Sequence, residues 1–239
     1  MRYAHSLGSM SSAKMEGKLK KPFDYINVVL QIIEHLLSWQ APECESSVNV
    51  PYLVIESTKR IQRAYIVKSN QIVSLAFPFQ VRNKVDSVTG HCKWHVRYND
   101  MDISAVILSK CRVLYNDYVA YYGHKSYLEI ASAQDLSNAD VLGAIRLFEI
   151  LMITEPAYIR YDYDPQGCKG LKHPPCHFDC NFIDVHHYKV GLHERINLAQ
   201  IEDMLDKDTN CWFISKHKHP VYNVNKFVKM KSLKIKKHK

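Results

Sequence analysis

Residues 157–192 read AYIRYDYDPQGCKGLKHPPCHFDCNFIDVHHYKVGL, and this stretch predicts the central strands and the candidate site of the chain. It holds three of the seven cysteines and four aspartates. Apolar or aromatic residues alternate with charged residues over 159–164, and a second alternation covers 177–182 after a loop that contains proline and glycine. A period of two indicates half-buried strands. If the two strands pair, their polar side chains share one face of a sheet.

Four of these polar side chains form a set suited to acid–base chemistry: Arg160, Asp162, His177 and Asp179. In this hypothesis His177 is the general base or acid, and Asp162 and Asp179 orient the imidazole and raise its basicity. Arg160 stabilises the negative charge that develops on the substrate. A base, an acid and an anion-binding group are what a metal-independent ribonuclease requires.

Two other interpretations of the same region stay open. Six residues are candidate ligands for a divalent metal such as zinc: His173, Cys176, His177, Cys180, His186 and His187. His177 with Asp179 would also suit a divalent metal on a strand. The spacing of the six residues does not match a structural zinc motif, and no CxxC pair is present. Alternatively, the polar residues form a satisfied network in which Arg160 makes an ordinary cross-strand ion pair.

Length and composition indicate a folded protein. The 239 residues are 46% hydrophobic, which is enough for a substantial core in one large or two small domains. No apolar run has the length of a membrane span, and the N-terminus lacks the apolar region of a signal peptide. The absence of a secretion signal and the odd number of cysteines indicate the reducing cytoplasm and mostly buried thiols.

The formal net charge of +8 belongs mainly to the two ends of the chain. Residues 216–239 carry nine lysines and no acid, whereas 22–215 hold 18 basic and 23 acidic residues. We expect a flexible leader over 1–21, a single domain over 22–215 and a basic tail over 216–239. The tail is expected to bind nucleic acid with an affinity that falls as the salt concentration rises. The tail lysines expected to bind are Lys226, Lys229, Lys231, Lys234, Lys236 and Lys237.

Periodicity predicts an α+β fold: a twisted antiparallel sheet with three longer helices and one short helix on one face. Helices are expected over 22–40, 103–122, 139–154 and 198–205, and strands over 52–55, 60–67, 72–79, 91–98, 127–131 and 211–214 besides the central pair. Residues 82–90 are expected to form a loop. The predicted helix caps are Asp100 or Asp102 for the second helix, Ser137 with Asp140 for the third, and Asn197 with Gln200 for the last.

Strand 91–98 would place His91, Lys93, His95 and Arg97 on one face. This basic face could contact a phosphate backbone, but the solvated outer face of a sheet is the favoured interpretation.

The runs RYDYDP, HPPCHFD and GLHERINLAQIEDML resemble the C-terminal half of an uncharacterised bacterial domain family with an HPxxH motif, over about residues 140–215. Asp179 stands where a second histidine is expected in that family. RYDYDP and the later histidines are also similar to small bacterial toxins that carry an RYD strand and a histidine-rich tail. These resemblances imply a bacterial cytoplasmic protein from a toxin–antitoxin or phage-defence setting.

The sequence therefore predicts a bacterial nucleic-acid-associated protein, with RNA as the favoured polymer. It would be an RNA-cleaving toxin or phage-defence effector that uses the His/Asp/Arg cluster. The alternative is a non-enzymatic accessory or antitoxin-like protein that binds a protein partner. No membrane association is expected.

Overall fold

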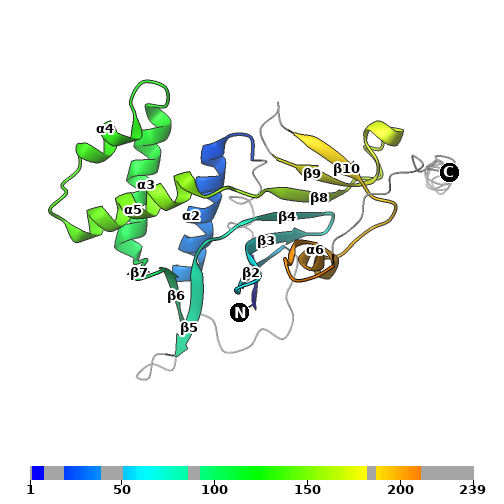
Figure 1. Cartoon of the computed structure of the whole chain (residues 1–239), viewed down its shortest axis with the longest axis horizontal. Helices are drawn as coiled ribbons and strands as arrows, with labels where there is room; N and C mark the ends of the chain where they lie inside the picture. Colours follow the sequence, from blue (N-terminus) through cyan, green and yellow to red (C-terminus); the bar gives the residue numbers. More distant parts are fainter. Residues whose placement is uncertain (1, 8–18, 39–50, 86–91, 182–186, 211–239) are drawn as a thin grey trace, which may run out of the picture.

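The computed structural model describes residues 2–7, 19–38, 51–85, 92–181 and 187–210, and the structural statements below concern these residues (Figure 1). It confirms the predicted α+β class. A seven-stranded antiparallel sheet has the order β1-β2-β3-β4-β8-β9-β10, and a three-stranded antiparallel sheet has the order β5-β6-β7. The strands are β1 (Arg2–Ser6), β2 (Tyr52–Ser57), β3 (Gln62–Lys68), β4 (Gln71–Ala76), β5 (Gln80–Val85), β6 (Cys92–Tyr98), β7 (Met101–Asp102), β8 (Ile159–Tyr163), β9 (Cys176–Cys180) and β10 (Tyr188–Gly191). The helices are α2 (Pro22–Ser38), α3 (Ala105–Ala120), α4 (Tyr127–Ser132), α5 (Ala139–Ile153) and α6 (Leu198–Leu205), with a 3-10 turn η1 (Gly170–Lys172).

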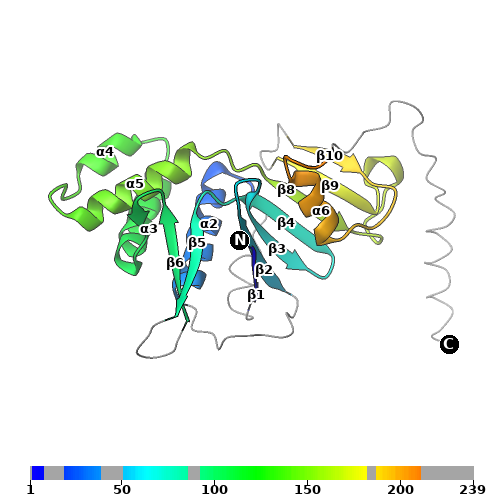
Figure 2. The ribbon, with the colours of Figure 1, turned by 60° about the horizontal axis from the view of Figure 1, so that its bottom comes forward.

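Helix α2 is the central element of the larger core. It begins at Pro22, where a missing N–H costs no helical hydrogen bond. The backbone N–H groups of Lys20 and Lys21 donate to the Asp24 carboxylate at 2.7 and 2.9 Å, which holds the first turn in place. Its apolar face packs with the large sheet and with α3 and α5, which lie with α4 on the other side of α2 in both views (Figures 1 and 2).

The large sheet is apolar on both faces near its centre, so it supports two separate cores. In β2, Leu53 and Ile55 belong to the core around α2, whereas Val54 between them belongs to a second core. Leu198 and Ile201 of α6 pack in that second core. The predicted placement of all helices on one face is therefore wrong for α6, because strands that are buried on both faces need a cover on each side.

Two predicted elements have a different structure. Residues 82–85 belong to strand β5 and not to a loop, because pairing with β6 buries Val81 opposite Val96. Residues 127–131 form helix α4 and not a strand, since a capping box starts the helix. In that box the Glu129 N–H donates to the Ser126 hydroxyl, and Glu129 accepts from the Ser126 N–H at 2.6 Å.

The capping residues of helices α3 and α5 differ from the predicted ones. Ser104 caps α3 in place of Asp100 or Asp102, and Asn138 caps α5 in place of Ser137. The capping box of Asn197 and Gln200 at α6 is confirmed. The helical periodicity had placed the bodies of these helices correctly, and the extended residue that precedes the first turn supplies the cap.

Within the expected leader, residues 2–6 form strand β1. Strand β1 pairs antiparallel with β2, and the Tyr3 hydroxyl donates to the Val81 carbonyl oxygen at 3.1 Å. The rings of Tyr3 and His5 both pack edge-on against Trp94 of β6. These contacts join the edge of the large sheet to the small one. The predicted strand 211–214 and the basic tail lie outside the described residues.

Strands β8, β9 and β10 form the end of the sheet farthest from β1 (Figure 1). Within the described residues, the core around α2 includes no side chain from these three strands. Their face on the α2 side is therefore available for polar groups. None of the described helices has the length and the apolar composition of a membrane span.

Candidate functional site

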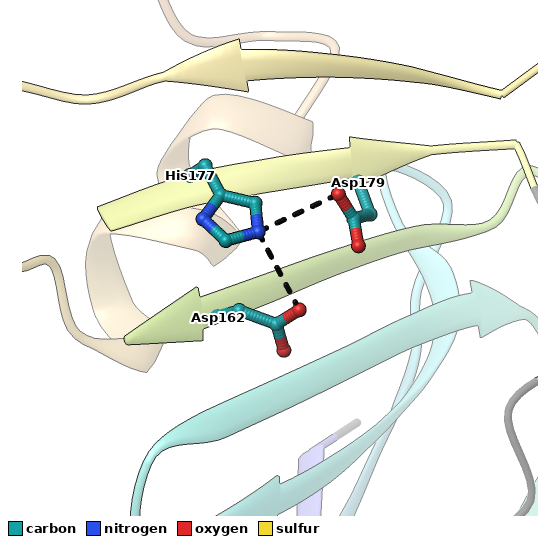
Figure 3. Close-up of side chains that lie close together, drawn as sticks. All are labelled: Asp162, His177 and Asp179. Carbon is teal, nitrogen blue, oxygen red and sulfur yellow. Dashed lines mark ion pairs between the residues drawn. The ribbon is translucent and has the colours of Figure 1, made fainter. Parts of the chain in front are cut away.

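The register of β8 and β9 brings the four predicted side chains together. The strands are antiparallel neighbours, with Arg160 opposite Asp179 and Asp162 opposite His177. Because residues two apart share a sheet face, all four side chains point to the same side. In Figure 3 one nitrogen of the His177 ring faces both carboxylates, Asp179 on the same strand and Asp162 on the neighbouring strand. The prediction that these groups converge is confirmed.

Asp179 is the most buried acid of the cluster, with 2% of its side chain exposed. Its two oxygens accept from different cations: Oδ2 from Nη2 of Arg160 and Oδ1 from Nζ of Lys189. Burial alone would raise the pKa of Asp179, but the hydrogen bond from Lys189 and the charges of Lys189 and Arg160 outweigh it, and the pKa is lowered. Asp179 is therefore held as a carboxylate.

Arg160 joins the two acids. Its Nε donates to Oδ2 of Asp162 at 2.8 Å, while Nη2 reaches Asp179. The second oxygen of Asp162 accepts from Nε2 of Gln71 on β4 at 2.9 Å. Burial opposes the charge on Arg160, but Tyr158 and the two carboxylates raise its pKa above the usual value. Three strands thus fix the guanidinium and the Asp162 carboxylate.

The tautomer of His177 follows from its hydrogen bonds. Nδ1 lies 2.9 Å from the Pro174 carbonyl oxygen, which can only accept, so Nδ1 carries the proton and Nε2 presents a lone pair. Nε2 lies 3.7 Å from Oδ2 of Asp162, 3.6 Å from Oδ1 of Asp179 and 3.2 Å from Nζ of Lys189. Both carboxylates thus face Nε2, and the backbone orients the ring through its hydrogen bond with Nδ1.

Both carboxylates raise the pKa of His177 as expected, but the net shift is in the opposite direction. Burial and the charge of Lys189 lower the pKa of His177, and they outweigh the raising effect of Pro174, Asp179 and Asp162. Only 1% of the His177 side chain is exposed. At neutral pH the imidazole is therefore uncharged, and its lone pair lies inside a cluster whose two acids are paired with Arg160 and Lys189.

Lys189 is the functional residue that sequence reasoning missed. It lies on β10 directly opposite Asp179, and 28% of its side chain is exposed. His187 directly precedes β10. Its Nε2 is 3.6 Å from Oδ1 of Asp179, and its side chain is 33% exposed. The cluster is thus most open to water along β10. The available signal was the short run YKV, too brief for periodicity to identify a strand.

The predicted metal pair of His173 and Cys176 is wrong in its geometry. The His173 ring packs against His177 with centroids 4.5 Å apart, whereas Cys176 packs with Tyr161 and Phe178 in the core on the opposite face of the sheet. Burial raises the pKa of the Cys176 thiol, as expected for an inert buried cysteine. The described residues that can share an ion are instead Asp162, His177 and Asp179, whose ligand atoms all lie within 4.8 Å of one another.

The tail lysines named above lie outside the described residues, so the structure does not relate them to this cluster. Comparison with family models, with curated proteins and with solved structures finds no match to this chain. The resemblance to the HPxxH domain family and to the small toxins therefore stays a prediction, and the geometry of the cluster carries the functional argument.

Proposed function

We propose that this chain acts on nucleic acid, with RNA favoured, and cleaves a phosphodiester bond at the cluster of Arg160, Asp162, His177 and Asp179. The observation that carries the proposal is the convergence of an uncharged imidazole lone pair and two carboxylates on one point beside a guanidinium. The resemblance to bacterial toxins and to the HPxxH family favours a toxin or phage-defence role for this activity.

The groups suit the two tasks of phosphodiester cleavage. A hydroxyl or water at the point of convergence gives its proton to one of these groups as its oxygen bonds to phosphorus. The bond from phosphorus to the leaving oxygen then breaks, and the same group returns the proton to that oxygen. The Arg160 guanidinium, and Lys189 beside it, stabilise the negative charge on the phosphoryl oxygens. RNA is favoured because the 2′-hydroxyl next to each phosphate is a nucleophile that the polymer itself supplies.

A basic face on the small sheet supports binding of nucleic acid. Its members share one side of β5 and β6 and are Arg82, Lys84, Lys93, His95 and Arg97. Lys84 lies directly opposite Lys93, and Arg82 opposite His95, with Arg82, Lys84 and Lys93 exposed. A phosphate backbone is attracted to a sheet face with this density of basic side chains. We therefore favour a nucleic-acid contact over a merely solvated face.

The catalytic assignment is tested with labelled RNA and the full-length protein, with and without EDTA. We expect His177→Ala and Asp162→Asn to lose cleavage, because each removes a group at the point of convergence. His124→Ala, at an exposed turn after α3, is the matched control and should cleave normally. Melting temperatures separate loss of chemistry from loss of folding. Cleavage by a folded His177→Ala variant at the rate of the parent protein would refute the assignment.

Binding is tested separately on the basic face and on the tail. The double variant Lys84→Ser/Lys93→Ser should lower affinity for RNA and reduce the slope of log affinity against log salt by about 0.7–0.9 per lost phosphate contact. Lys125→Ser, on the helical side of the molecule, is the control. A chain that ends at Ile214 tests the tail, because unchanged salt-sensitive retention on RNA would remove its proposed role.

A second candidate function is favoured by one observation. Asp179 is buried and Asp162 is partly buried, and both acids are already balanced by Arg160 and Lys189. Such a self-contained network also suits a non-enzymatic accessory or antitoxin-like protein whose task is to bind a protein partner. Absence of RNA cleavage together with a stability loss in the cluster variants would favour this function.

A further inference from the structure

We infer that Asp162, His177 and Asp179 form a binding site for a divalent transition-metal ion, such as zinc or manganese, and that the Lys189 ammonium occupies the position of that ion in the present structure. The inference deepens the proposed function by naming its cofactor. It rests on that function for the chemical role of the ion, whereas binding can be tested by itself.

The distances match those of a ligand set around one ion. Nε2 of His177 lies 3.7 Å from Oδ2 of Asp162 and 3.6 Å from Oδ1 of Asp179 (Figure 3). Nitrogen and oxygen ligands bind zinc at about 2.0–2.2 Å, so at a tetrahedral angle they lie roughly 3.3–3.6 Å apart. Two of the three ligand pairs therefore have nearly the required spacing, and all three ligand atoms lie within 4.8 Å of one another.

His177 has the orientation and protonation of a metal ligand. Metal-binding histidines almost always donate the second ring N–H to a carbonyl or carboxylate, and Nδ1 of His177 does so to Pro174 at 2.9 Å. Nε2 is left with its lone pair toward both acids.

Lys189 shows that a cation belongs at this point. Its Nζ binds Oδ1 of Asp179 and lies 3.2 Å from Nε2 of His177, so it contacts two of the three candidate ligands. An ammonium has three donors and no acceptor, and it satisfies here the acceptors that an ion would otherwise coordinate. Its side chain is more exposed than those of Asp162, His177 and Asp179, and its long stem can swing out toward solvent.

The exchange changes the charge of the cluster. With Lys189 in place, two carboxylates face two cations and the formal charge is balanced. With a divalent ion in its place, the same acids and Arg160 carry a net positive charge, which attracts a phosphate group. Three protein ligands also leave a position for water, the arrangement of catalytic rather than structural zinc. With the ion bound, His177, Asp162 and Asp179 would serve as its ligands and no longer as proton acceptors, and the ion would supply the activation of the nucleophile.

The test measures binding and stability of the full-length protein after dialysis against EDTA. Lys189→Met should lower the melting temperature, because Asp179 then keeps only Arg160, and manganese should restore it. Calorimetric titration should show manganese binding to Lys189→Met about tenfold more tightly than to the parent chain, since no charge-assisted hydrogen bond must be broken. Lys68→Met, on β3, is the matched control and should behave like the parent chain.

Two further variants decide where the ion binds. Asp162→Asn and Asp179→Asn should abolish both the binding and the recovery of melting temperature. Binding that survives in both variants would be binding to other histidines of this histidine-rich chain, and it would overturn the inference. So would the absence of binding to both the parent chain and Lys189→Met. RNA cleavage in EDTA would then leave the proposed function standing, whereas specific manganese binding without cleavage would leave only the ion site.

Discussion

Replacement of Arg160 by methionine is the perturbation that tests most directly whether the cluster is a buried charge network. Methionine keeps much of the side-chain volume and removes the guanidinium that joins Asp162 to Asp179. The three side chains are 14%, 15% and 2% exposed, so the two acids that remain are poorly hydrated. The variant therefore measures how much the free energy of unfolding falls when these carboxylates lose a charged partner.

The magnitude follows from the remaining partners. Removal of one member of a buried ion pair costs about 3–5 kcal/mol. Asp179 keeps Lys189 and Asp162 keeps Gln71, so we expect the lower end, about 3 kcal/mol in the free energy of unfolding. For a domain of this size that corresponds to a fall in melting temperature of roughly 6–12 °C.

Arg146→Met is the matched control, because Arg146 contacts Asp100 at 3.0 Å with side chains 47% and 79% exposed. A surface pair of this kind contributes little to stability, because water screens both charges. Urea unfolding at pH 7, followed by circular dichroism, measures both variants against the parent chain. Equal and small losses for Arg160→Met and Arg146→Met would show that water reaches the cluster freely, and the account of its pKa shifts would be wrong.

Three further outcomes are expected. In the folded state the pKa of His177 is lowered from 6.5 and that of Asp179 from 3.8. Each group therefore stabilises the folded state fully at pH values above its ordinary pKa, and this stabilisation is lost as the pH falls through the folded-state pKa. The free energy of unfolding should therefore fall below pH 6.5 and again below pH 3.8, and His177→Gln should flatten the first step in urea titrations across pH. Asn197→Ala should lower the stability of the α6 region by about 1 kcal/mol in hydrogen exchange, because it removes a cap, and unchanged protection of 198–205 would contradict the capping box. Deletion of residues 1–7 should lower the melting temperature, since Tyr3 and His5 pack on Trp94, whereas a true leader would be removed without effect.

Local patterns in the sequence determined much of the fold and the identity of the central residues. The period of two over 159–164 and 177–182 placed Arg160 and Asp162 on one side of their strand, and His177 and Asp179 on one side of theirs. The apolar spacing of α2 and the Asn197 cap of α6 were equally readable. These features depend on backbone geometry over a few residues, which the sequence specifies directly.

Only the tertiary structure decided which side chains those residues contact. Pairing of β8 with β9 set the register of the cluster, and pairing of β10 with β9 brought in Lys189. Burial then lowered the pKa of His177, where the sequence had suggested a more basic imidazole. Long-range packing likewise made β5 a strand and placed α6 on the opposite face of the sheet. Strand partners, burial and the second cation depend on contacts between distant segments, and no local period encodes them.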